Sequence, residues 1–302
     1  MNKKMITKIS EGLGNQLFMY AHAYALSRKH KIDFYIDPYS GYYQKKHNYM
    51  FFLDNFNISS KIAPDNFLFN NFYKNLLKKS LLFVDNFKSK KNFFFERKNI
   101  DKLTKYSPID ISNSNDIIFI DGNFESEKYF LNYKKDLLKE FSFKNEKQFL
   151  NNKYLKIINE FNVISICIRQ NRYSDTLKTK KSQNAITKSN LFVEETIEYI
   201  FKSINFFKDK INNPIYLIWS NDFEGLDKFF DSEKFIFVKN QSNKVITDFY
   251  LLTKCKYFIV GPSTFHWWGA WLSNNLNNII VRPENLSSSN NTDFWPDSWI
   301  SI

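Results

Sequence analysis

The segment GLGNQ, residues 12–16, lies between a short strand pattern at 5–9 and a helical pattern at 17–29. Gly12 and Gly14 carry no side chains, so backbone N–H groups there can approach an anion closely. The N-terminus of the following helix would add a favourable dipole. The pattern is not G-x-G-x-x-G, because the position of the third glycine is not occupied by glycine. An anion-binding loop and a tight turn both stay open.

A second polar segment, CIRQNRY at 167–173, follows the apolar run VISICI at 163–168. It contains Arg169 and Arg172, two of only five arginines in the chain. The planar guanidinium group can grip phosphate oxygens in bidentate fashion. The segment therefore indicates a phosphate ligand, and the alternative is a surface loop with two ion pairs.

A third segment, WSND at 219–222, follows the apolar run at 215–220. Ser220 and Asp222 have side chains that can contact a polar ligand at the end of a strand. Serine, asparagine and aspartate are also common helix caps. Capping alone would account for these residue types, so both interpretations stay open.

The stretch from Asp248 to residue 271 is rich in aromatic residues and contains GPST before a helical pattern. The hydroxyls of Ser263 and Thr264, together with the N-terminus of the helix that follows, would form a second anion site. His266 and the three tryptophans after it fit a packed helix face, and core packing is their default interpretation. A chemical role for His266 is the alternative.

Composition sets limits on these interpretations. The 302 residues carry 43 basic and 31 acidic side chains, a formal charge of +12. This charge favours an anionic partner, although the excess of lysine, asparagine, isoleucine and phenylalanine is typical of drift in an AT-rich genome. No apolar run approaches a membrane span, and two cysteines make no disulfide framework. G-x-S-x-G, H-E-x-x-H and Walker motifs are absent, as is the D-x-D motif of manganese-dependent sugar transferases.

Alternating apolar strands and helical patterns predict parallel sheets built from βαβ units. Ligands of such sheets bind beyond the carboxyl ends of the strands, where the four polar segments lie. Expected strands beyond those named are 32–36, 92–96, 117–120, 235–238, 257–260 and 278–281. Expected helices are 71–84, 126–143, 145–160, 189–207, 222–230, one that starts at Asp248, and one from Ser263 to about 274.

These segments together resemble glycosyltransferase family 11, the α-1,2-fucosyltransferases. GLGNQLFMYAHAYALS is similar to the N-terminal G-G-L-G-N-Q signature of the family, and GNFESEKYF at 122–130 to its G-Y-[FW]-Q-S-E-K-Y-F segment. WSND, the stretch 248–271 and the tail FWPDSWISI at 294–302 resemble three further family segments. The matches span both ends of the chain.

The chain also departs from the family pattern. The family motif H-x-R-R-G-D-Y becomes C-I-R-Q-N-R-Y here, so Cys167 replaces the histidine and Arg172 stands where the family has aspartate. His266 replaces a serine, and Glu125 replaces a glutamine. The resemblance is therefore to a divergent member.

The resemblance implies an α/β fold of GT-B type, with two Rossmann-like domains facing a cleft. We expect an N-terminal acceptor-side domain at 1–155 and a C-terminal nucleotide-sugar-binding domain at 156–302. The implied reaction is metal-independent transfer of L-fucose from GDP-L-fucose, with inversion, to a 2-hydroxyl of a galactoside acceptor. The donor is a substrate, and no cofactor is expected.

The resemblance also implies roles for individual residues. Arg169 would stabilise the leaving diphosphate, the catalytic contribution that electrostatic donors supply when no metal does so. Asp248 would accept hydrogen bonds from guanine. The remaining expected contacts to the nucleotide sugar come from Gly12, Gly14, Asn15, Arg172, Ser220, Asp222, Ser263 and Thr264. Glu125 and Asp175 are candidates for the general base, and a phosphate oxygen of the donor is a third.

Three other functions stay open. The same fold could use another nucleotide sugar, or an inactive relative could serve as a subunit in glycan assembly. A nucleic-acid-binding protein is disfavoured, because the lysines are dispersed and do not alternate with aromatic residues. We expect a cytoplasmic protein that makes peripheral contact with the inner membrane, where lysines favour anionic lipid and lipid-linked acceptors occur. The product would be a bacterial surface polysaccharide or lipooligosaccharide.

Overall fold

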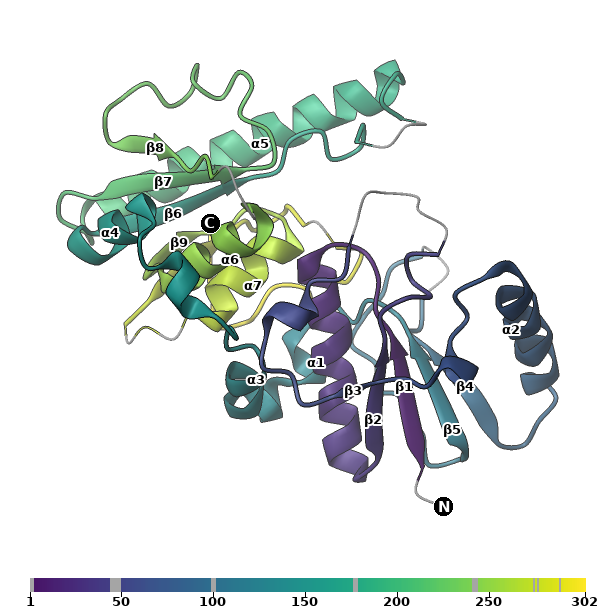
Figure 1. Ribbon diagram of the computed structural model, residues 1–302. Helices are drawn as coiled ribbons and strands as arrows, with labels where there is room; N and C mark the ends of the chain where they lie inside the picture. The colour runs from purple at the N-terminus through teal and green to yellow at the C-terminus, as the bar shows by residue number, and fades with distance from the viewer. Residues whose placement is uncertain are drawn as a thin grey trace. The chain divides into compact units, whose positions relative to one another are not determined.

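The computed structural model describes residues 3–43, 50–98, 102–175, 179–240, 244–273, 275, 277–287 and 289–302, which form two compact units (Figure 1). Unit 1 comprises Met1–Lys144 and Asn290–Pro296, and unit 2 comprises Asn145–Ser289 and Asp297–Ile302. The division after Lys144 differs from the expected boundary at 155/156. The reason is that Phe149, before that boundary, already stacks on Tyr250 of unit 2 at a centroid distance of 4.3 Å.

Unit 1 is built on a parallel sheet of five strands in the order β3-β2-β1-β5-β4. The central strand β1 pairs with β2 on one side and with β5 on the other. The strands and helices of this unit are β1 (Lys4–Lys8), α1 (Leu13–His30), β2 (Asp33–Asp37), β3 (Lys61–Ile62), α2 (Phe72–Asp85), β4 (Lys91–Phe95), β5 (Ser114–Asp121) and α3 (Lys134–Glu140).

Helix α1 packs into the core of unit 1 on nearly every face, as its apolar sequence predicts. It begins at Leu13, four residues before the expected start, and Gly12 is its N-cap residue. Most of the GLGNQ segment therefore forms the first turn of a helix and not a separate loop. The glycine at the N-cap adopts an extended backbone that closes the link to β1 within a few residues.

Unit 2 contains a second parallel sheet, with six strands in the order β11-β10-β9-β6-β7-β8. Its apolar core comprises the strand residues of β6 and one face of the long helix α5. The strands and helices are α4 (Lys153–Glu160), β6 (Val163–Ile168), α5 (Gln183–Lys208), β7 (Ile215–Ser220), β8 (Phe235–Phe237), α6 (Lys244–Lys254), β9 (Tyr257–Ile259), α7 (Thr264–Leu272), β10 (Ile279–Arg282) and β11 (Ile300–Ser301).

Several expected helices differ in the structure. The helix at 126–143 is replaced by two 3₁₀ turns and the short α3, because buried Phe130 adopts a non-helical backbone to reach Phe18. The helix at 222–230 is a series of turns, in which Gly225 has a φ of 71°. The expected helix at 145–160 is a 3₁₀ turn followed by α4.

Among the described residues, no helix has both the length and the apolar character needed to cross a bilayer. Helix α5 is long enough at 26 residues, but one face is polar.

The C-terminal segment 290–296 is an integral part of unit 1. Phe294 is fully buried, and its ring lies 6.3 Å from that of Phe18 in α1. The backbone of Thr104 donates to Asn290 and accepts from Thr292, each at 3.0 Å. Unit 1 therefore depends on residues that follow unit 2 in the chain.

We predict that Phe294→Ala lowers the free energy of unfolding of unit 1 by about 3–5 kcal/mol, the usual cost of a large aromatic cavity. Hydrogen exchange followed by mass spectrometry would show lost protection in α1 and retained protection in α5. Phe161→Ala, at a side chain that is 52% exposed, is the control and should change neither. Equal loss of protection in both units would contradict the assignment of this segment to unit 1.

Candidate functional site

The carboxyl edge of the unit 2 sheet contains a topological switch point between β6 and β9. From β6 the chain adds β7 and β8 on one side, and then β9, β10 and β11 on the other. Open α/β sheets bind ligands at such points, beyond the carboxyl ends of the strands. Arg169 directly follows β6, and Gly261 follows β9 by two residues. The switch point thus lies between the arginine-bearing loop and the GPST segment.

Arg169 forms an ion pair with Asp175. Its Nη2 lies 2.6 Å from Oδ2 of Asp175, and both side chains are 30% exposed. Exposed ion pairs of this kind contribute only about 0–1 kcal/mol, so an anionic ligand can compete for the guanidinium. Asp175, one of the two expected candidates for the general base, is thus the partner of Arg169.

Gly261 packs tightly against the backbone of β6 at this edge. A Cβ on this residue would lie 1.9 Å from the carbonyl oxygen of Cys167, which no side chain can tolerate. The glycine thereby allows the loop after β9 to lie directly against the end of β6. The thiol of Cys167 is fully buried, and burial raises its pKa well above the usual range. It stays protonated and carries no charge at neutral pH.

His266 lies in the first turn of α7 and is also buried. Its Nδ1 would be 3.4 Å from a Cβ on Gly261 and has no hydrogen-bond partner within the described residues. Burial, with a smaller contribution from the positive charge of Arg169, lowers the pKa of His266 to about 3. The imidazole is therefore neutral and adds no positive charge to the site.

The loops after β6 and β7 are joined by hydrogen bonds. The backbone N–H of Gln170 donates to Oδ1 of Asn221 at 2.8 Å, and Asn171 donates to the carboxylate of Asp222 at 3.2 Å. Asn171 has a φ of 55°, a left-handed conformation that asparagine tolerates, at the position of the family's glycine. Ser220 donates to the carbonyl of Asp222. Asn221 and Asp222 thus hold the two loops together, and Ser220 orders the loop after β7.

Three other expected residues lie at the same edge. The guanidinium of Arg172 lies over the ring of Phe192 in α5, 5.3 Å from its centroid. Ser263 is the N-cap residue of α7, but its hydroxyl makes no capping hydrogen bond. Thr264 is the first residue of the helix, and both hydroxyl residues are partly exposed.

Asp248 lies in the second turn of α6, whereas the sequence predicted that it starts the helix. Its side chain is 6% exposed and accepts a hydrogen bond of 2.6 Å from Nδ2 of Asn240, which follows β8. Burial raises the pKa of Asp248 to about 6, against the opposing effects of Asn240 and the charge of Lys244. Sequence reasoning missed Asn240, because no motif surrounds it.

The carboxyl edge of unit 1 holds the remaining expected residues. Gly14 and Asn15 lie in the first turn of α1, and the amide of Asn15 donates to the carboxylate of Glu11. Gln16 is fully buried and donates from Nε2 to the carbonyl of Met50 at 2.8 Å. The first turn of α1 is thus fixed to the segment that follows the undescribed residues 44–49.

Two carboxyl groups, the partly buried Glu96 and the buried Glu125, lie near the ends of β4 and β5. Oε2 of Glu96 accepts from the backbone N–H groups of Asn123 and Phe124 at 2.9 and 3.0 Å, and burial raises the pKa of Glu96. Glu125, the other expected candidate for the base, is 8% exposed. Glu96 was missed because only the fold brings it to the GNFESEKYF segment. It is a further candidate for the base.

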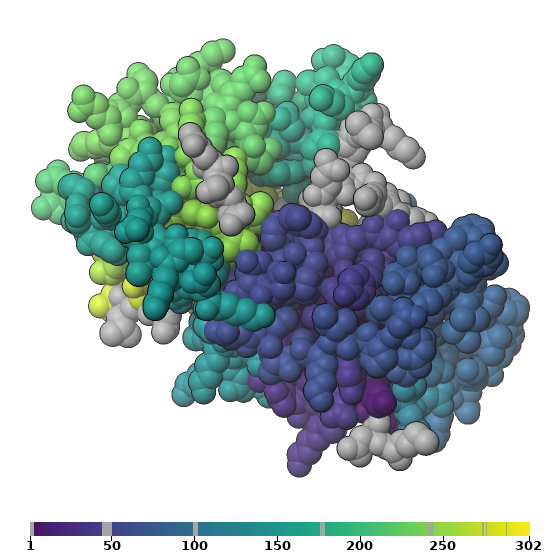
Figure 2. All heavy atoms as spheres, in the orientation of Figure 1, coloured from purple at the N-terminus to yellow at the C-terminus, as the bar shows by residue number. Residues whose placement is uncertain are grey.

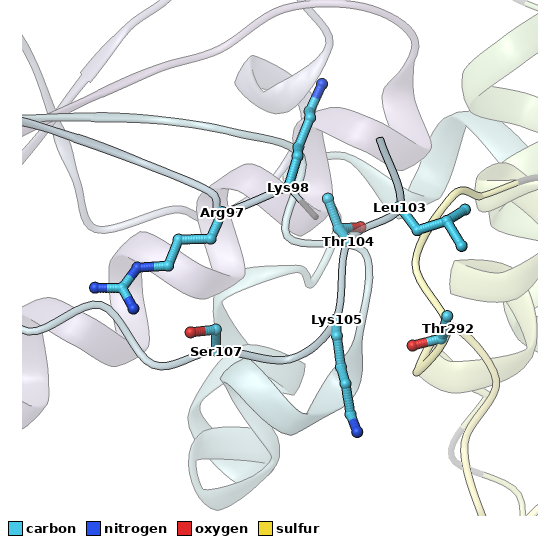
Figure 3. A pocket seen from close by; sticks show the side chains of 7 residues that line it. All are labelled: Arg97, Lys98, Leu103, Thr104, Lys105, Ser107 and Thr292. Atoms are coloured by element: carbon cyan, nitrogen blue, oxygen red, sulfur yellow. The ribbon is translucent and has the colours of Figure 1, made fainter. Parts of the chain in front are cut away.

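A pocket of about 320 Å³ in unit 1 is lined by basic and hydroxyl residues. Figure 3 shows the ammonium groups of Lys98 and Lys105 pointing in opposite directions and the guanidinium of Arg97 pointing away from both. The charges do not converge on one point, so the pocket is not a preformed anion site.

Comparison with solved structures identifies the fold class. The chain is similar to the NodZ α-1,6-fucosyltransferase soaked with GDP-fucose, with a TM-score of 0.51, 13% identity, and coverage of 90% of this chain and 93% of the other. The two parallel α/β units correspond to the GT-B fold, as expected from the sequence.

The sequence comparison then gives the family. The model described as "Glycosyl transferase family 11" matches residues 4–302, and the chain belongs to this family. An α-1,2-colitosyltransferase of Escherichia coli is 27% identical over 99% of this chain and 98% of its own length. The O-antigen biosynthesis glycosyltransferase WbnK of Escherichia coli is 28% identical over 99% of this chain and 100% of its own. The protein is therefore a glycosyltransferase of a family with relatives in O-antigen biosynthesis.

We predict that Gly261→Ala lowers the free energy of unfolding of unit 2 by about 3 kcal/mol, because the Cβ would overlap backbone that cannot move cheaply. Gly225→Ala is the control: nothing lies within 4 Å of its added Cβ, and only its φ of 71° opposes the change. That variant should cost about 1 kcal/mol. Urea unfolding with equal midpoints for the two variants would show that the contact with Cys167 is unimportant.

Proposed function

We propose that the protein transfers L-fucose from GDP-L-fucose to a 2-hydroxyl of a galactoside acceptor during assembly of a bacterial surface glycan. The observation that carries this proposal is the position of Arg169 at the switch point of unit 2, with the N-terminus of α7 across it. The structure of NodZ, a protein of similar fold that was soaked with GDP-fucose, supports the choice of donor.

The reaction breaks the bond between the anomeric carbon and the diphosphate oxygen and forms a bond to the acceptor oxygen, with inversion. Negative charge develops on the diphosphate as it leaves. Arg169 would exchange Asp175 for this group, and the hydroxyls of Ser263 and Thr264 would add donors without a metal. The proton of the acceptor hydroxyl would pass to a carboxylate, for which Glu96, Glu125 and Asp175 are candidates, or to a phosphate oxygen of the donor.

Guanine recognition is proposed for Asp248. An ionised carboxylate can accept from both N1–H and the 2-amino group of guanine, and a uracil base presents no such pair of donors. Asn240 fixes one carboxylate oxygen of Asp248 and so sets the orientation of the group. The expected contacts of Gly12, Gly14, Asn15, Arg172, Ser220 and Asp222 remain part of this proposal.

A second candidate donor is a colitosyl nucleotide. The α-1,2-colitosyltransferase that matches nearly the whole chain favours it. A donor screen with a galactoside acceptor would distinguish the two sugars, since the guanine and diphosphate contacts proposed above would serve either one.

The acceptor is proposed to be a lipid-linked glycan at the cytoplasmic face of the inner membrane. O-antigen biosynthesis by the relative WbnK supports an acceptor of the surface-glycan class. Excess lysine favours contact with anionic lipid.

We predict that Arg169→Ala lowers turnover by about 10²-fold or more, the usual cost of one lost donor to a developing anion. Arg97→Ala, in the pocket of unit 1, is the matched control and should leave turnover unchanged. Asp175→Asn should tighten binding of GDP several-fold, because the competing carboxylate is gone. Full activity of Arg169→Ala in EDTA would exclude the proposed role.

We also predict that the affinity for GDP-L-fucose falls as the pH drops below about 6, approaching tenfold per pH unit. Burial raises the pKa of Asp248 to about 6, so the ionised acceptor is lost below that value. GDP-L-fucose is the better probe because its diphosphate diester has no group that titrates in this range. Asp248→Asn should bind weakly with a flat pH profile, and calorimetry showing an unchanged preference for GDP over UDP would contradict the assignment.

A further inference from the structure

Helix α2 of unit 1 presents its polar side inward. Lys74 pairs with Asp65 at 2.8 Å, and Lys78 pairs with Asp121 of β5 at 3.3 Å. Asp85 is 4% exposed, and its carboxylate accepts from two backbone N–H groups of β4. The helix lies beside β4 (Figure 1), and these polar contacts hold it there. A surface helix normally buries its apolar side instead.

The apolar side of the helix faces outward. Eight large apolar side chains within residues 72–87 are 36–80% exposed, out of 23 such side chains in the described part of the chain. With 3.6 residues per turn, the seven within the helix cover about half of its circumference. We refer to these eight residues as the α2 face: Phe72, Tyr73, Leu76, Leu77, Leu81, Phe83, Val84 and Phe87. Figure 2 shows this blue part of the chain at the surface of unit 1.

The exposed charged side chains of residues 72–91 all carry a positive charge. Residues 72–91 contain six lysines and one carboxylate, and that carboxylate is the buried Asp85. Lys79 lies at the edge of the face, and Lys88 and Lys90 follow it in the turn before β4. All three are exposed. A partner that covers the face must therefore be apolar and negatively charged.

We propose that the α2 face docks on the surface of a lipid bilayer that contains anionic headgroups. A helix with an apolar half, aromatic side chains and a lysine rim is the form that lies within the membrane interface, where apolar side chains insert between headgroups. Each lysine near an anionic surface adds attraction. A specific protein interface would need about one hydrogen bond per 100–200 Å², yet the eight side chains of the α2 face offer one hydroxyl, that of Tyr73.

This inference deepens the proposed function. It rests on that function in one respect: docking on the membrane would give the enzyme access to a lipid-linked acceptor. Binding to lipid needs neither nucleotide nor acceptor. A wrong donor assignment would change nucleotide calorimetry and leave vesicle binding intact, so the two proposals fail separately.

The test is sedimentation of the full-length protein with vesicles of phosphatidylethanolamine and phosphatidylglycerol at a 70:30 ratio, compared with phosphatidylcholine. Leu76→Asn combined with Phe83→Asn should lower the partition coefficient by roughly 30-fold, because two inserted side chains are lost. Lys79→Glu combined with Lys88→Glu should lower it about 30-fold or more on the anionic vesicles and little on phosphatidylcholine.

The matched control is Leu191→Asn combined with Phe201→Asn, at two side chains of α5 that are 53% and 44% exposed. It should bind vesicles as the unchanged protein does, and all variants should keep the same melting temperature. Absence of vesicle binding by the unchanged protein would overturn the proposal. Equal vesicle binding by the Leu76/Phe83 variant would also overturn it. So would light scattering that shows a dimer for the unchanged protein and a monomer for this variant, since the α2 face would then contact a second copy of the chain.

Discussion

The close approach of Gly261 to the carbonyl of Cys167 is the constraint on which the site in unit 2 depends. A parallel sheet brings the ends of β6 and β9 to one edge, but side chains would keep the loops beyond them apart. Because residue 261 has no Cβ, the GPST segment can lie against the end of β6 at Cys167, two residues before Arg169. The N-terminus of α7 and the guanidinium thereby belong to the same switch point. Both would act on a diphosphate only because the backbone contact brings them together.

The altered arginine motif is compatible with this geometry, because the substituted residues stabilise the loop after β6. Gln170 and Asn171 replace the family's second arginine and glycine, and both donate to the loop after β7. Asn171 adopts the left-handed backbone for which the family uses glycine. At the position of the family's histidine, this chain has Cys167, whose buried thiol is neutral. His266, which replaces a serine of the family, is neutral as well. Arg169 then supplies positive charge at the switch point, and Asp175 keeps it partly neutralised until an anion binds.

The sequence predicted the strands of unit 2 closely, since β6 and β7 begin and end where the apolar runs do. Apolar runs bounded by polar loops report burial on both sides of a parallel sheet. The prediction of one helix over 126–143 was wrong, because periodicity indicates which residues are buried but does not reveal the backbone break at Phe130. Glu96 and Asn240 could not be found from sequence, because each becomes part of a site only through contacts with residues distant in the chain. For the same reason, the sequence did not predict that segment 290–296 belongs to unit 1.

Helix α2 shows why a helical pattern alone does not tell which side is buried. Its apolar and polar halves were both visible in the sequence, and the default expectation places the apolar half in a core. Here three charged inward side chains, Lys74, Lys78 and Asp85, find partners within unit 1. The apolar half is left outside, and the lysines around it are no longer explained by compositional drift alone. Drift can supply lysines to the chain, but it does not concentrate exposed phenylalanines and leucines among them on one side of one helix.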